Sequence, residues 1–158
     1  MAPRYYDAKN FTSADSLGYL LKLAHSLLHD EAVAAFEGHD LSFTQWLVLV
    51  KLHEGVGTAA ELCRIMWHDT GALTRLLDGL EERGYVERER SDADRRVVDL
   101  KLTAAGRRKL AELMPLTVDR LNTALAGFSK SEFAELTRLL NQLIASLREM
   151  ERTRGAPS

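Results

Sequence analysis

The chain has 158 residues, a formal net charge of −2, and 46% hydrophobic and 28% charged residues, which is ordinary globular composition and argues against a disordered protein. No apolar run approaches the roughly 18 residues that span a bilayer. Residues 1–10 lack a secretory signal pattern, and the single cysteine cannot form an intrachain disulfide. We therefore expect a cytoplasmic protein with no membrane partner.

Charge is distributed unevenly along the chain. Residues 1–63 carry 4 basic and 8 acidic side chains, residues 64–110 carry 11 basic and 9 acidic, and residues 111–158 carry 6 of each. A mildly basic middle segment in an acidic chain is compatible with local contact to nucleic acid.

The first half of the chain predicts helices. After an N-terminal arm over residues 1–15, apolar residues recur at helical spacing over residues 16–36. Residues 42–45 (SFTQ) and 58–61 (TAAE) are capping boxes, so a second and a third helix are expected to start there.

A fourth helix and a hairpin follow. Asp69 or Thr70 is the predicted N-cap of the helix GALTRLLDGLEER, and Gly84 is its predicted left-handed end. Residues 85–90 and 97–102 read as two short strands that are joined by a charged tip.

Two long helices complete the chain. Thr103 is expected to cap a helix over residues 104–126, and the capping box at residues 129–132 (SKSE) opens the last one. One side of that helix is apolar, and residues 153–158 are expected to fray. The apolar residues on that side are Phe133, Leu136, Leu140, Leu143, Leu147 and Met150. The predicted fold is mainly α with a small β-hairpin wing: a winged helix-turn-helix with additional long helices.

The fourth helix has the residues expected of a DNA-recognition helix. In a helix-turn-helix the second helix enters the major groove with its N-terminal residues nearest the bases. Leu73, Leu76, Leu77 and Leu80 form the predicted inward stripe. The opposite side holds Thr70, Gly71, Ala72, Thr74 and Arg75. Small residues permit close approach, Thr can bond phosphate or base, and Arg can bind guanine bidentately. The alternative is a surface helix with one arginine.

The charged tip suggests a second contact. Asp94 and Arg96 lie two residues apart, on the same side of an extended segment. Asp92 or Asp94 could brace one arginine, leaving Arg95 or Arg96 to project into a minor groove. The alternative is a solvated tip whose exposed ion pairs contribute little.

The segments LTRLLDGLEERGYVER and DADRRVVDLKLTAAG resemble the recognition helix and wing of the multiple antibiotic resistance regulator (MarR) family, and the similarity extends over most of residues 16–150. The resemblance implies a homodimeric transcription regulator, most commonly a repressor, that binds a pseudo-palindromic operator in double-stranded DNA. It implies a dimerisation region over residues 16–40 and 104–152 and a DNA-binding lobe over residues 41–103. Residues 1–15 would then be a flexible arm, and residues 153–158 a tail.

By position, the resemblance assigns DNA contact to the five polar or small residues of the fourth helix. It also assigns a minor-groove role to Arg96, with Asp94 as its structural partner and Arg95 sharing the contact. Release from DNA by a small aromatic or phenolic effector is implied as well. His25, Trp46 and Arg64 are the candidate effector residues, and Tyr19 and Trp67 come after these three. Alternatively, Trp46 belongs to the core, and Arg64 faces phosphate or solvent.

Other functions remain open at this stage. Cys63 could sense oxidants, although a lone helical cysteine is usually a small buried hydrophobe. His25 and His29 have the i, i+4 spacing of a metal-binding pair, but no cysteine joins them and we expect no metal and no cofactor. The chain contains no Gly-rich phosphate loop, H-E-x-x-H or G-x-S-x-G motif, so an enzyme is not expected. A winged helix that binds protein and not DNA is the remaining alternative.

Overall fold

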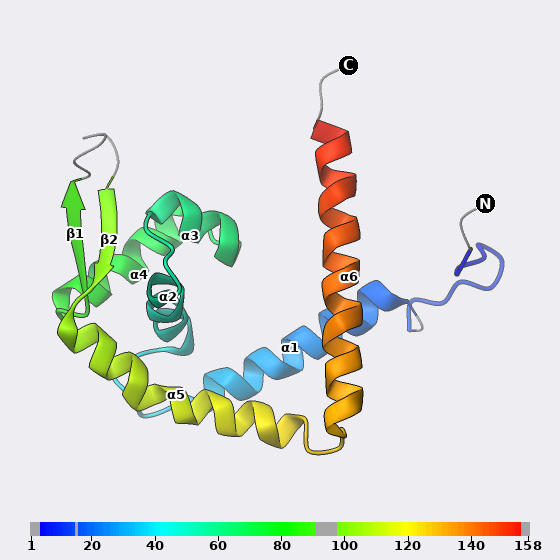
Figure 1. Ribbon diagram of the computed structural model, residues 1–158, viewed down its shortest axis with the longest axis horizontal. Helices are drawn as coiled ribbons and strands as arrows, with labels where there is room; N and C mark the ends of the chain where they lie inside the picture. Colours follow the sequence, from blue (N-terminus) through cyan, green and yellow to red (C-terminus); the bar gives the residue numbers. More distant parts are fainter. Residues whose placement is uncertain (1–3, 15, 91–97, 156–158) are drawn as a thin grey trace. The chain divides into compact units, whose positions relative to one another are not determined.

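The computed structural model describes residues 4–14, 16–90 and 98–155 of the chain. The elements in chain order are α1 (Leu17–Ala35), α2 (Phe43–His53), α3 (Ala59–Met66), α4 (Thr70–Glu82), β1 (Val86–Arg90), β2 (Val98–Leu102), α5 (Ala104–Ala124) and α6 (Lys130–Gly155). This is the predicted mainly helical fold with a two-stranded wing (Figure 1). Within these residues, no helix combines the length and apolarity that crossing a bilayer requires.

The chain divides into two compact units, residues 1–120 and 121–158. Helix α1 and most of α5 group with the helix-turn-helix and the hairpin in the first unit. Contacts within the first unit give the reason: the Trp46 indole N–H of α2 donates to the Leu110 carbonyl of α5 at 3.4 Å, and Arg120 of α5 pairs with Glu31 of α1 at 3.4 Å.

The predicted helix starts are confirmed at α2 and α3. Ser42 Oγ accepts a hydrogen bond from the Gln45 amide at 3.2 Å, and the Gln45 side chain accepts from the Ser42 amide at 3.1 Å. Thr58 and Glu61 make the same reciprocal pair at 3.2 and 3.1 Å. Each box satisfies backbone donors that the first helical turn leaves unpaired, so these short helices begin at defined residues.

The core of the first unit is formed by one face of each helix from α2 to α4, by the hairpin and by the start of α5. Its buried residues are Phe36, Leu41, Trp46, Val48, Leu49, Leu52, Leu62, Leu73, Leu77, Leu80, Val86, Leu100, Leu102, Leu110 and Leu113. Burying each of these leucines stabilises the fold by about 2 kcal/mol. The predicted stripe of α4 is confirmed, with Leu76 only partly buried against the same core.

The hairpin packs beside α4 and α3 (Figure 1). Its strands are antiparallel, with Val86 opposite Leu102 and Arg88 opposite Leu100. The Leu100 amide donates to the Gly57 carbonyl at 2.8 Å, which ties β2 to the loop before α3. The base of the wing is therefore continuous with the helix-turn-helix.

The turn from the hairpin into α5 is tightly packed. Thr103 Oγ1 donates to the Gly84 carbonyl at 2.7 Å and accepts from the Gly106 amide at 2.9 Å. A Cβ at Gly106 would lie 2.1 Å from the Tyr85 carbonyl oxygen, so only glycine permits this approach. Gly84 has φ +69°, the predicted left-handed conformation that follows α4.

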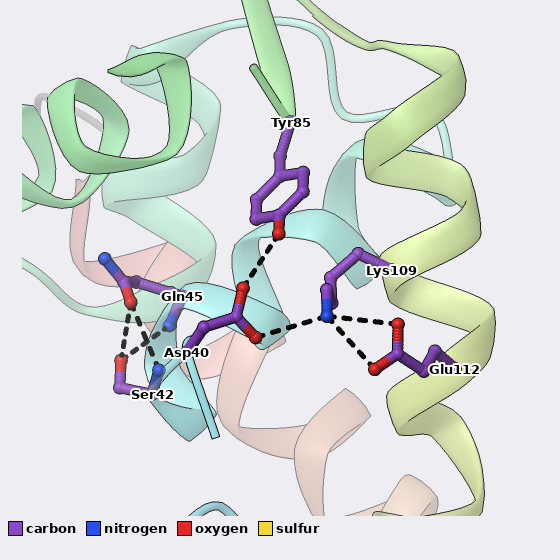
Figure 2. Close-up of polar contacts among 6 residues, drawn as sticks. All are labelled: Asp40, Ser42, Gln45, Tyr85, Lys109 and Glu112. Atoms are coloured by element: carbon purple, nitrogen blue, oxygen red, sulfur yellow. Dashed lines mark hydrogen bonds and ion pairs between the residues drawn. The ribbon is translucent and has the colours of Figure 1, made fainter. Parts of the chain in front are cut away.

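A polar cluster fixes α5 against the loop before α2 (Figure 2). Asp40 accepts a hydrogen bond from the Tyr85 hydroxyl at 2.8 Å and pairs with Lys109 Nζ at 3.2 Å, and Lys109 also contacts Glu112 at 3.0 Å. Partial burial opposes ionisation of Asp40, but the hydrogen bond from Tyr85 and the Lys109 ammonium outweigh it. The pKa of Asp40 is therefore held below its usual range.

The second unit contains α6. Ser129 and Glu132 form the predicted capping box, with Ser129 Oγ accepting from the Glu132 amide at 3.2 Å. The helix extends through Gly155, three residues beyond its predicted limit, and the Thr153 hydroxyl donates to the Met150 carbonyl at 3.0 Å there. No described side chain of α6 is buried. Its exposed large apolar residues are Phe133, Leu136, Leu139, Ile144, Leu147 and Met150.

Replacement Asp40→Asn should remove an acid-sensitive part of the stability. Because the pKa of Asp40 is lowered on folding, the ionised carboxylate stabilises the fold above roughly pH 4, and this contribution disappears as the pH falls through the lowered value. Urea unfolding at pH 7 should show a loss of up to about 1 kcal/mol in the variant, and this difference should shrink toward zero as the pH falls below the lowered pKa of Asp40. Glu37→Gln, at an exposed loop residue, is the control and should show no such trend. A pH-independent difference for Asp40→Asn would contradict this account.

Candidate nucleic-acid interface

Helices α3 and α4 form the helix-turn-helix, and α4 begins at a strong cap. Asp69 is the N-cap, and its Oδ1 accepts from the Ala72 amide at 2.8 Å. This backbone hydrogen bond lowers the pKa of Asp69, so the carboxylate that stabilises the positive end of the helix stays ionised at neutral pH.

The residues predicted for DNA recognition lie together on the first turns of α4. Thr70, Gly71, Thr74 and Arg75 are exposed and Ala72 is half-buried. The Thr74 hydroxyl donates to the Thr70 carbonyl at 2.7 Å, which leaves its oxygen able to accept. Within the described part of the chain Arg75 makes no ion pair. The face opposite the leucine stripe therefore offers small side chains, hydroxyls and a guanidinium to solvent.

The wing residues Asp94, Arg95 and Arg96 lie outside the described residues, as does Asp92. Their predicted roles stay predictions. The structure describes the two strands on either side of these residues, β1 and β2.

An ion pair that sequence reasoning missed joins the wing to α4. Arg88 Nη2 lies 2.6 Å from Asp78 Oδ1, and Arg88 Nη1 lies 3.0 Å from Glu81 Oε2. Arg88 follows Val86 by two residues, so both side chains leave β1 on the face toward the helix. The sequence did contain a signal for this ion pair. It places two carboxylates three residues apart on α4 and an arginine at a strand position that faces the helix. One guanidinium thus orients the hairpin on the helix and pairs with two carboxylates.

The three candidate effector residues have different environments. His25 is exposed on α1, with its ring centroid 6.1 Å from that of His29. Trp46 is only 4% exposed, and its indole N–H is satisfied by Leu110. Arg64 is exposed on the last turn of α3. Trp46 is therefore a core residue, which is the alternative interpretation that the sequence left open.

A cavity of about 570 Å³ lies along α5 in the first unit. It is lined by His53, Arg107, Leu110, Ala111, Met114, Pro115, Val118 and Asp119. The three candidate effector residues are not among them. Arg107 Nη1 donates to the Leu102 carbonyl at 2.7 Å, so its guanidinium is held at the cavity by the end of β2. The walls are mainly apolar, and the Arg107 guanidinium and the Asp119 carboxylate are among the lining groups.

The residues considered for redox or metal sensing are also described. The Cys63 thiol is free and half-buried on α3. Across residues 4–14, 16–90 and 98–155, no three His, Cys, Asp or Glu side chains are grouped to hold a metal ion.

Residues 39–97, which contain the helix-turn-helix and the start of the wing, match the sequence profile of the MarR family. Over 78 residues, 49% of this chain, the sequence is 37% identical to the transcriptional repressor MprA of Escherichia coli. It is 35% identical over 112 residues, 70% of this chain, to the HTH-type transcriptional regulator TtmR of Methylorubrum extorquens. This chain belongs to the MarR family.

Solved structures of the MarR family agree with this fold. A mutant of MarR from Escherichia coli complexed with operator DNA superposes with a TM-score of 0.72 at 28% identity, over 87% of this chain and 99% of that one. The chain spans about half the length of the curated relatives that it matches, 44% of MprA and 54% of TtmR.

Replacement Arg88→Met should loosen the wing from α4. Methionine keeps most of the aliphatic stem but removes both ion pairs and leaves Asp78 and Glu81 uncompensated. Because these groups are partly exposed, urea unfolding should show a loss of about 1 kcal/mol. The matched control is Arg90→Met, two residues along β1, since Arg90 makes no ion pair with any described residue. Equal stabilities of the two variants would show that the Arg88 pair does not anchor the wing.

Proposed function

We propose that this protein is a homodimeric transcriptional regulator that binds a pseudo-palindromic operator in double-stranded DNA, acts as a repressor, and is released by a small aromatic effector. The observation that carries the proposal is the exposed N-terminal face of α4, which is held beside the wing by Arg88. The operator-bound structure of a MarR mutant and the repressor MprA support the same reading.

In this proposal, the first turns of α4 enter the major groove. The small side chains of Gly71 and Ala72 let the helix backbone approach the DNA closely. Thr70 bonds a phosphate or a base edge, Thr74 accepts a hydrogen bond from a base amino group, and Arg75 binds a guanine through two hydrogen bonds. The leucine stripe supports this placement because it sets which face of the helix is exposed.

The wing supplies the second contact. We assign Arg96, with Arg95, to the minor groove, and Asp94 to bracing Arg96; this assignment rests on the sequence and on the family resemblance. The minor groove concentrates negative potential, and a guanidinium on a narrow hairpin suits it.

A second copy of the chain covers the exposed apolar faces of the long helices. An exposed apolar surface of this extent is unusual for a monomer. On α1 the exposed apolar side chains are Leu17, Tyr19, Leu20, Leu21, Leu23, Leu27, Leu28 and Val33, and α6 exposes the six residues named above. A two-fold dimer places two recognition helices on half-sites about one helical turn apart.

The cavity along α5 is the effector site that the side chains support best. An aromatic ring would pack on Leu110, Met114 and Val118, and its carboxylate would face Arg107 and His53. The effector residues predicted from the sequence, His25, Trp46 and Arg64, have weaker support. Trp46 is a core residue, and its indole N–H already donates to a backbone carbonyl.

The DNA contact is tested by fluorescence anisotropy with the intergenic DNA beside the protein's own gene. Arg75→Ala should weaken binding by roughly 1–3 kcal/mol and relax specificity at one base pair. The control is Arg83→Ala, at the other end of α4, where the guanidinium donates only to the Gly79 carbonyl within the described residues. If both variants keep wild-type affinity, α4 does not read DNA with Arg75.

The effector is tested in the same assay with a panel of benzoates and hydroxybenzoates. At least one compound should weaken DNA binding by the wild type, and Arg107→Met should need at least about tenfold more of it because the charged partner is lost. The variant should bind DNA normally without compound. Equal sensitivity of wild type and variant would remove Arg107 from the effector site.

A further inference from the structure

Trp67, in the turn between α3 and α4, combines two unfavourable features. Its backbone has φ 55° and ψ 35°, the left-handed conformation, and it is the only described residue other than glycine with positive φ. Its side chain is 90% exposed, whereas Trp46, the other tryptophan of the chain, is 4% exposed.

Neither feature stabilises the first unit. Glycine adopts a positive φ without strain, and a residue with a Cβ does not. Tryptophan has the largest side chain with a mainly apolar surface, but an indole that is almost fully exposed gains no free energy from burial. Strain of this kind is typical of positions where the side chain acts on something outside the fold.

The position of Trp67 indicates what the indole meets. It lies two residues before Asp69, the N-cap of α4, and is therefore next to the helix end proposed to enter the major groove. Arg64, three residues earlier on α3, and Thr70, the first residue of α4, are also exposed. Arg64 and Thr70 can both donate to phosphate oxygens, and the indole adds an N–H donor and a flat apolar ring.

We propose that Trp67 contacts the DNA backbone beside each half-site, with Nε1–H donating to a phosphate oxygen and the ring lying on the adjacent sugar. The inference rests on the proposed DNA-binding function and extends it to a residue of the turn. The contact is with the backbone and not with a base, so it strengthens binding without setting the sequence that is read. The indole is neutral, so it releases no counterion of its own.

The test uses full-length protein and a duplex that the wild type selects from a random-sequence pool. Trp67→Gly should keep or raise Tm, because glycine accepts the positive φ, and should weaken binding roughly tenfold through loss of a hydrogen bond to a charged group. Trp67→Phe keeps an aromatic ring without the N–H, so its affinity for the duplex should lie between those of the wild type and Trp67→Gly. The salt dependence of binding should keep its slope in both variants. Ile65→Ala, an exposed apolar residue of α3, is the control and should bind as the wild type does.

Tryptophan emission gives a second readout. DNA should shift the emission of the wild type and shield it from iodide, and Trp67→Gly, which keeps only the buried Trp46, should show neither change. Unchanged affinity of a folded Trp67→Gly would overturn the proposal. So would loss of the dimer in sedimentation, which would assign the indole to the partner copy. Failure of the wild type to select any duplex is a different result, because it contradicts the DNA-binding function itself.

Discussion

Burial of one side of α4 is the constraint on which the other features depend. Leu73, Leu77 and Leu80 are at most 2% exposed, and rotating the helix about its axis would bring them into water at about 2 kcal/mol each. The helix therefore has one permitted orientation. In that orientation Thr70 and Arg75 face solvent at the capped end, so the hydrophobic core determines which residues are available to a ligand.

Charged side chains then position the neighbouring elements on this helix. Arg88 holds β1 against α4 through Asp78 and Glu81, and Asp40 links the loop before α2 to α5 through Lys109. Partly exposed pairs contribute little stability, but their geometry is directional. We propose that these ion pairs fix the positions of the wing, α4 and the cavity along α5 relative to one another within the first unit.

Local features of this fold are predictable from sequence, and long-range ones are not. The capping boxes beginning at Ser42 and Thr58 and the leucine stripe are visible because their partners are three or four residues apart. The Tyr85–Asp40 hydrogen bond joins residues 45 positions apart, and no pattern in the sequence pairs them. The left-handed Trp67 is equally hidden, because glycine or asparagine is the usual signal for that conformation. For the candidate site, helical periodicity and the family resemblance predict which residues of α4 are exposed. Neither of them predicts the cavity beside Arg107.

The most direct test of the central claim, that the solvent-facing side of α4 and the wing bind DNA, is the salt dependence of complex formation by the wild-type protein. Binding through phosphates releases counterions, so log Kd should rise linearly with log salt, with a slope of roughly 0.9 per phosphate contacted. A steep line that corresponds to several phosphate contacts is the expected result. An affinity for DNA that does not change with salt, or no affinity at low salt, would contradict the account and leave a winged helix that recognises a protein.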